Sequence, residues 1–251
     1  MNTWIFLRGL TRESRHWGDF PEEFCREVPE VKVCCPDLPG NGVLSGEESP
    51  LSVEEMLECI RAQLNGQDIM PPYHLLAMSL GAMVAVSWAA KYPEEIRGCV
   101  LINTSLRSFS AFYRRLKPGS YGRLLKLGLP GCADREREQT VFELTSHRPE
   151  RADQVLKAWV AHRLEYPVRA RNALRQLLAA ARFSAPPVRP PVPILVLVSR
   201  NDALVDASCS HRIARHWVTA LAEHPTAGHD LPLDDGAWVA RRVSDWLKSQ
   251  P

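Results

Sequence analysis

The chain has 251 residues, of which 45% are hydrophobic and 24% are charged, and its formal net charge is +2 at pH 7. That length fits one α/β domain that carries an inserted subdomain. A net charge this small gives no indication of a nucleic-acid partner, and no apolar run reaches the roughly 18 residues that a membrane span needs. The composition therefore predicts a globular protein with no membrane span and no nucleic-acid partner.

The first ten residues are apolar over only a short stretch and carry no basic leader or small-residue cleavage site. They predict a first strand rather than a signal peptide. The seven cysteines form no C-x-x-C pair, which favours small buried thiols in a reducing compartment over disulfides or a metal site. We therefore expect a cytoplasmic protein.

Short apolar runs alternate with helical patterns along most of the chain. The predicted strands are Trp4–Leu7, Val31–Cys35, Tyr73–Met78, Cys99–Asn103, Ile194–Ser199 and, more weakly patterned, Thr219–His224. Among the helices, one is predicted to start at the N-cap Ser52, with Glu55 completing a capping box, and to stop at Gly66. Apolar strands that alternate with helices are typical of a mostly parallel central sheet with helices on both faces.

The alternation stops between residues 104 and 185. Helical patterns at 152–166 and 170–183 lie in this stretch without a convincing strand, and a proline-rich connector follows at 185–193. The sequence therefore predicts an α/β core formed by 1–103 and 186–251, with 104–185 as an inserted helical cap.

The predicted cap is strongly basic. Residues 104–185 hold thirteen arginines and three lysines against seven acidic residues, a net charge of +9. Solvated helix faces explain such a pattern most simply. The alternative is a surface for an anionic partner, such as an acidic carrier protein or coenzyme A, with Arg114, Arg115 and Arg123 as candidates.

Ser79 is a lone hydroxyl between the apolar run that ends at Met78 and the helix-like run that follows. The gap allows only a sharp turn, which would expose the hydroxyl at the carboxyl end of a strand, where open α/β sheets place their sites. The small neighbours Ala77 and Gly81 give A-x-S-x-G, close to the G-x-S-x-G of a nucleophile elbow. Ser79 is thus the predicted nucleophile.

A serine nucleophile needs a base and an orienting carboxylate. His229 lies in a loop with proline and glycine before the last predicted helix, where it could reach the end of the sheet, whereas His211 and His216 fall in a helical pattern. Asp202 directly follows a buried-type strand, while Asp206 is better placed to cap a helix. We predict His229 as the base and Asp202 as its partner.

Backbone N–H groups are the expected donors for a developing oxyanion. Leu80 follows the nucleophile and begins the predicted helix. Leu10 lies in the loop after the first strand, where Gly9 allows the backbone to turn. The predicted nucleophile, base, carboxylate and backbone donors account for the chemistry without a metal ion or a cofactor, and we expect neither.

At this point the chain resembles the α/β-hydrolase superfamily over nearly its whole length. The matching segments are Arg8-Gly9-Leu10 with Trp17, "PDLPGNG" at 36–42, the turn around Ser79, "SRNDALV" around Asp202 and "AGHD" around His229. The chain order Ser79, Asp202, His229 is that of the family's catalytic triad. Three departures are Arg8 and Asn41, where the family usually has histidine, and Ala77, where it has glycine.

Within the superfamily the chain looks most similar to small bacterial carboxylesterases of the pimeloyl-carrier-protein methyl esterase type and to related thioesterases. The resemblance implies the α/β-hydrolase fold with a helical cap, and cofactor-independent cleavage of an ester or thioester by a serine. Two alternatives remain open. The triad could serve a C–C bond hydrolase or lyase, or it could be vestigial in a non-catalytic ligand receptor.

Overall fold

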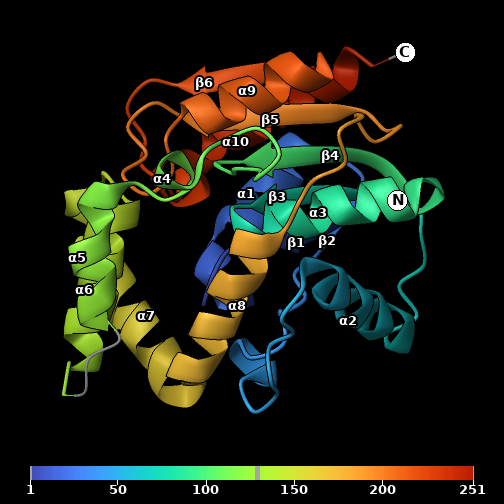
Figure 1. Cartoon of the computed structure of the whole chain (residues 1–251). Coiled ribbons are helices and arrows are strands. Elements are labelled where there is room, and N and C mark those ends of the chain that lie inside the picture. The colour runs from blue at the N-terminus through green and yellow to red at the C-terminus, as the bar shows by residue number, and fades with distance from the viewer. Residues whose placement is uncertain (1, 128–130, 251) are drawn as a thin grey trace.

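A computed structural model describes residues 2–127 and 131–250. One all-parallel sheet lies at its centre, with the strand order β2-β1-β3-β4-β5-β6 (Figure 1). The strands are β1 (Asn2–Leu7), β2 (Val31–Cys34), β3 (Tyr73–Met78), β4 (Ile96–Ile102), β5 (Ile194–Ser199) and β6 (Ala220–His224). This arrangement confirms the predicted α/β fold, and each strand matches one expected from the sequence.

Helices cover both faces of the sheet. Those of the core are α1 (Phe20–Glu27), α2 (Val53–Gly66), α3 (Leu80–Lys91), α9 (Ser208–Trp217) and α10 (Leu231–Lys248). Helices α1 and α10 pack in one apolar cluster on one face, and α2, α3 and α9 contribute to a second cluster on the other. All six residues of β5 are buried, as a strand covered on both faces requires.

The start of β4 differs from the predicted boundary, whereas both ends of α2 agree with the prediction. Strand β4 begins three residues before the predicted Cys99, because Gly98 breaks the apolar pattern without breaking the strand. A Cβ at Gly98 would lie 2.8 Å from the Trp246 ring, so the close approach of α10 explains the glycine. Ser52 Oγ accepts the Glu55 N–H at 3.2 Å, as predicted, and Gly66 is the last residue of the helix.

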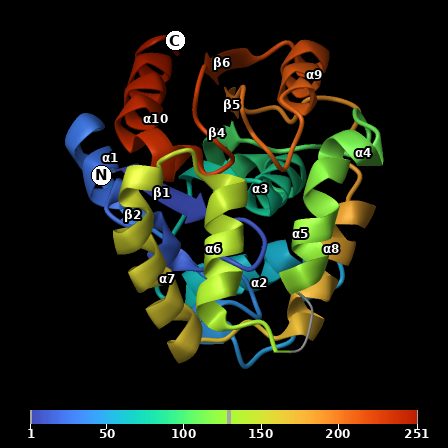
Figure 2. The same ribbon diagram turned by 90° about the vertical axis from the view of Figure 1, so that its left-hand side faces the viewer.

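The stretch between β4 and β5 forms helices and no strand among its described residues. They are α4 (Phe112–Arg115), α5 (Tyr121–Leu127), α6 (Asp134–Thr145), α7 (Ala152–Glu165) and α8 (Ala170–Arg182). Figure 2 shows α5, α6 and α7 standing together in front of the core, with α8 returning toward it. The predicted helical insertion is therefore present.

The seven cysteines are all free thiols. Only Cys99 and Cys209 are buried, and Cys25 is exposed, so the expectation of buried thiols is wrong for the other five. Burial raises the pKa of Cys35 to about 12, which keeps that thiol protonated at neutral pH. Within the described residues, no helix combines the length and the apolar character needed to cross a bilayer.

Candidate active site

Ser79 occupies the sharp turn between β3 and α3 that the sequence predicted. Its backbone has φ 54° and ψ −115°, an unusual conformation for a residue other than glycine. The Ser79 N–H donates to the Ile102 carbonyl at 3.0 Å, which fixes the turn beside the end of β4. A Cβ on Gly81 would lie 2.6 Å from the Arg8 carbonyl oxygen, so α3 can start this close to β1 only with glycine there.

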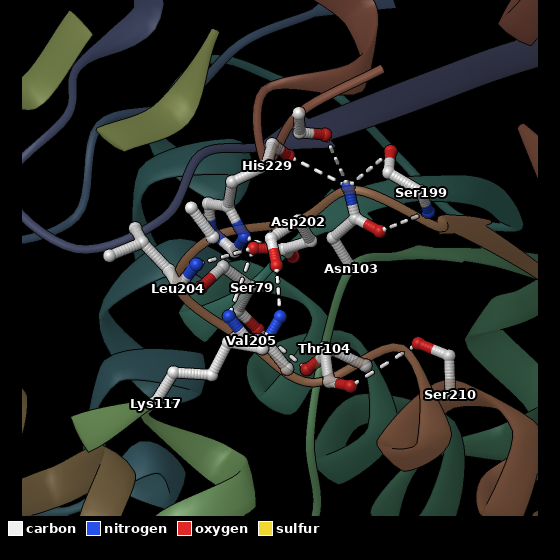
Figure 3. A network of polar contacts seen from close by, with 12 residues as sticks. Ser79, Asn103, Thr104, Lys117, Ser199, Asp202, Leu204, Val205, Ser210 and His229 are labelled. Atoms are coloured by element: carbon white, nitrogen blue, oxygen red, sulfur yellow. Dashed lines mark hydrogen bonds and ion pairs between the residues drawn. The ribbon is translucent and has the colours of Figure 1, made fainter. Parts of the chain in front are cut away.

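Asp202 and His229 form a buried hydrogen-bonded pair (Figure 3). His229 Nδ1 donates to Asp202 Oδ2 at 2.7 Å. The other carboxylate oxygen accepts the N–H groups of Leu204 and Val205 at 2.8 and 2.9 Å. Because Nδ1 carries the proton, a neutral His229 presents an unprotonated Nε2, which is the form that a base needs.

Several opposing effects set the pKa of His229. Its burial lowers the pKa, but the charge of Asp202, the hydrogen bond to it and the charge of Asp230 together raise the pKa by more, so that the net change is upward from 6.5. The raised pKa means that the ring is a stronger proton acceptor than a free imidazole. The structure therefore pairs these two residues as the sequence predicted.

The other acidic and histidine candidates lie elsewhere, as expected. Asp206 Oδ1 accepts the Ser208 N–H at 2.9 Å and so caps the first turn of α9. His211 contacts Glu223 at 2.7 Å, and His216 lies 3.1 Å from a backbone carbonyl. These contacts are those of structural and surface groups.

Two consecutive residues after β4 join the backbone around Ser79 to that around His229. Asn103 Nδ2 donates to the His229 carbonyl at 2.8 Å, and Thr104 Oγ1 donates to the Ser79 carbonyl at 2.9 Å (Figure 3). Asn103 also exchanges hydrogen bonds with Ser199 at the end of β5. Sequence reasoning missed Asn103, which the predicted strand Cys99–Asn103 included, although a polar residue at the end of an apolar run was a usable signal.

The loop after β1 lies against Ser79. A Cβ on Gly9 would lie 3.1 Å from Ser79 Cβ and 3.7 Å from Ser79 Oγ. The N–H groups of Leu10 and Leu80 donate no hydrogen bond to any residue that the structure describes. Leu80 directly follows Ser79 and Leu10 directly follows Gly9, so both N–H groups remain candidates for the predicted oxyanion hole.

Arg8 and Asp230 form a buried ion pair next to this site. The guanidinium donates two hydrogen bonds to the carboxylate, at 3.2 and 2.5 Å, and the side chains are 4% and 2% exposed. The pair ties the loop that begins at Gly9 to the residue after His229. Arg8 thus holds the loop through two hydrogen bonds to Asp230, a partner that no local sequence pattern indicated.

Hydrogen bonds from the inserted helices reach the two loops that carry Asp202 and His229. Lys117 Nζ donates to the Asp202 carbonyl at 2.7 Å (Figure 3), and Ser120 Oγ donates to the Ala203 carbonyl at 2.8 Å. On the other loop, the Asp230 N–H donates to the Thr145 carbonyl at 2.7 Å. The insertion is therefore connected to the backbone around Asp202 and around His229.

Glu13, His16 and His162 are the one group of side chains in the described residues that are close enough together to share a metal ion. Both ring nitrogens of His16 are already engaged, since Nδ1 accepts the Glu13 N–H and Nε2 lies 2.9 Å from Arg12 Nη1. Burial and the charge of Arg12 lower the pKa of His16 well below its usual value. A cation there would face that arginine, so the group does not fit a metal site.

The fold, the Ser79 turn and the Asp202–His229 pair together define a protein of the hydrolase type that the sequence resembled. The model of the alpha/beta hydrolase family matches residues 4–242, and the chain belongs to that family.

Its relatives are distant. It is similar to pyrrolizixenacetamide deacetylase from Xenorhabdus hominickii, at 34% identity over 41% of this chain and 38% of the relative. It is also similar to the biotin biosynthesis bifunctional protein BioHC of Teredinibacter turnerae (strain ATCC 39867 / T7901), at 24% identity over 98% of this chain and 44% of the relative. The matches thus span less than half the length of these curated relatives. Among solved structures, a thermophilic esterase from Thermogutta terrifontis is similar with a TM-score of 0.75 and 21% identity, covering 99% of this chain and 90% of that one.

Proposed function

We propose that this chain is a cofactor-independent serine hydrolase that cleaves a carboxylic ester or thioester through an acyl-enzyme. The observation that carries the proposal is the buried 2.7 Å hydrogen bond between Asp202 and His229 at the end of the sheet where Ser79 occupies its strained turn. The esterase among similar structures shares the fold. The free cysteines fit a reducing compartment, so we propose the cytoplasm as its location.

In the first step, Ser79 Oγ forms a bond to the acyl carbon while His229 Nε2 takes the hydroxyl proton. The carbonyl π electrons move to the oxygen, which the N–H groups of Leu10 and Leu80 stabilise. Loss of one such donor costs about 10²- to 10³-fold in turnover in enzymes of this kind. Asp202 keeps the imidazole in the correct tautomer and stabilises its charged form.

In the second step, the bond from the acyl carbon to the alcohol oxygen or thiol sulfur breaks, and His229 gives its proton to the leaving group. Water then enters, His229 accepts one of its protons, and the hydroxide oxygen forms a bond to the acyl carbon. The bond to Ser79 breaks, and the proton returns to Oγ. The products are a carboxylic acid and free enzyme, with no redox change.

Ser79→Ala tests the proposal. The variant should unfold at the same temperature as the wild type and lose at least about 10³-fold in turnover of p-nitrophenyl acyl esters. A fluorophosphonate should label the wild type at Ser79 and leave the variant unlabelled. Retention of more than a tenth of the activity, or labelling at another residue, would contradict the assignment.

A panel of p-nitrophenyl esters of increasing chain length, methyl esters and acyl thioesters would define the substrate class. Labelling of Ser79 without turnover of any ester or thioester would favour a C–C bond hydrolase or lyase. Absence of both labelling and turnover would favour a ligand receptor. The two alternatives are therefore separated by the same assays.

A carrier-bound substrate is a finer proposal, supported by the +9 charge of residues 104–185. Two of the three candidate arginines have structural contacts. Arg115 donates to the carbonyls of Ala180 and Ala181 at the end of α8, and Arg114 lies 3.7 Å from Asp206. Arg123 on α5 is exposed and is the better candidate to meet an acidic carrier protein or coenzyme A.

Salt dependence tests this surface, since the Debye length is about 8 Å at physiological ionic strength. If the surface steers its partner, kcat/KM for an acyl group on a carrier should fall as salt rises, while that for a small neutral ester stays constant. Charge reversal by Arg123→Glu with Lys126→Glu, both on exposed positions of α5, should reproduce the high-salt value. Equal salt sensitivity for both substrates would show that the basic surface does not steer a carrier and is only a solvated helix face.

A further inference from the structure

The side-chain amide of Gln176 is buried at the contact between the cap helix α8 and the core. The residue is 0% exposed. Its Oε1 accepts the N–H of Thr11 at 2.8 Å, and its Nε2 donates to Asn41 Oδ1 at 2.8 Å and to Ser49 Oγ at 3.0 Å. Each polar atom of the amide therefore has a partner, which is the condition under which a buried amide fixes a local geometry.

The contacts of Gln176 converge on the loop after β1. Thr11 is held directly, and Arg12 is held through Asn41, whose Nδ2 donates to the Arg12 carbonyl at 3.0 Å. Thr11 has φ 57°, a left-handed conformation that is unfavourable for a β-branched residue. Such a conformation persists only where surrounding bonds impose it, and the bond from Gln176 is one of these.

We propose that Gln176 is a positioning residue for the oxyanion hole, acting from the cap through Thr11 on the adjacent N–H of Leu10. The inference rests on the proposed hydrolase function. The Thr11 N–H belongs to the peptide plane that follows Leu10, so holding that plane restrains the two backbone torsions at Leu10 that relate it to the Leu10 N–H. The cap thereby sets the direction of a donor that belongs to the core.

Gln176→Met keeps the volume of the side chain and removes its hydrogen bonds. We expect kcat for a p-nitrophenyl ester to fall by about 10-fold or more, since a displaced donor loses part of the roughly 10²- to 10³-fold that a deleted donor loses. KM should change by less than about threefold, because the interaction develops in the transition state. The affinity for an alkylboronic acid, which forms a tetrahedral adduct on Ser79, should fall with kcat.

Asn172→Leu is the matched control. Asn172 lies one turn earlier on α8, is 2% exposed, and binds the Ser49 N–H and the Glu47 carbonyl at 3.1 and 2.8 Å. The substitution removes a buried amide from the same contact without touching the loop after β1. It should lower the melting temperature as Gln176→Met does, but leave kcat and boronate affinity within about twofold of the wild type.

Hydrogen exchange gives a readout that does not depend on turnover. Peptides covering residues 8–13 should exchange at least about tenfold faster in Gln176→Met than in Asn172→Leu. If both variants keep the same kcat, boronate affinity and exchange rates in this segment, the positioning role is wrong. If the wild type neither reacts with a fluorophosphonate nor turns over esters, the hydrolase proposal fails instead, and the exchange comparison still decides whether Gln176 holds the loop.

Discussion

The buried ion pair between Arg8 and Asp230 gives a stability prediction that the structure makes quantitative. Arg8→Met keeps much of the side-chain volume but leaves the Asp230 carboxylate, 2% exposed, without its cation. Removing one partner of a buried ion pair costs about 3–5 kcal/mol, because the remaining charge is desolvated and unpaired. The variant also loses the packing of the guanidinium over the Trp17 ring, 4.7 Å from its centroid.

For a chain of this size, 1 kcal/mol corresponds to about 2–4 °C in melting temperature. Arg8→Met should therefore melt about 6–20 °C below the wild type in calorimetry or circular dichroism. Adding Asp230→Asn removes the stranded charge, so the double variant should melt above Arg8→Met alone. The comparison separates the ion pair from the packing of Arg8.

Arg171→Met is the control for a surface ion pair. Arg171 and Glu48 are 2.8 Å apart but 71% and 54% exposed, and breaking an exposed pair has little effect on stability. If Arg8→Met and Arg171→Met lower the melting temperature equally, the argument from burial is refuted. A double variant less stable than Arg8→Met would also refute it.

Three further predictions concern Asp202 and His229. kcat/KM should fall as the pH drops through the raised pKa of His229, above 6.5, because a protonated ring accepts no proton. Asp202→Asn removes the charge that does most to raise this pKa and leaves burial and the smaller effect of Asp230, so a pH–rate profile should show the acid limb at lower pH, with turnover reduced about 10⁴-fold. Asp206→Asn should stay near the wild type, and the reverse outcome would reassign the acid. Since the folded pKa exceeds the unfolded value, His229 stabilises the fold below about pH 6.5 and this contribution disappears as the pH rises through the folded pKa. The melting-temperature difference between the wild type and His229→Gln should therefore shrink over that range, and a difference that grows with pH would contradict the sign.

The sheet and the positions of Ser79, Asp202 and His229 could be predicted because each has a local signature. Apolar runs mark the strands, and the turn residues around Ser79 lie within five positions of one another. Asp202 comes shortly after a buried strand, and His229 directly follows a glycine in a loop. Parallel strands then place all their carboxyl ends at one edge, so local signals sufficed to bring distant residues together.

The contacts that brace the site had no such signature. Arg8 and Asp230 are 222 positions apart, and Gln176 lies 165 positions from Thr11. A lone arginine or glutamine carries no information about its partner until the chain is folded. Gly98 shows the opposite error. The glycine interrupts the apolar run and so suggested that the strand begins after it, but it is there because Trp246 packs against the strand at this position.

The hydrogen bonds between the insertion and the core have a consequence for protein engineering. Exchanging residues 104–185 alone for a segment without a lysine and a glutamine at the matching positions would remove the Lys117 bond to the Asp202 carbonyl and the Gln176 bond to the Thr11 N–H. Such an exchange would alter the backbone beside Asp202 and in the loop after β1, even though the side chains of Ser79, Asp202 and His229 are retained. A chimera meant to change substrate preference should transplant the cap together with the loops after β1 and β5, as one recombination block.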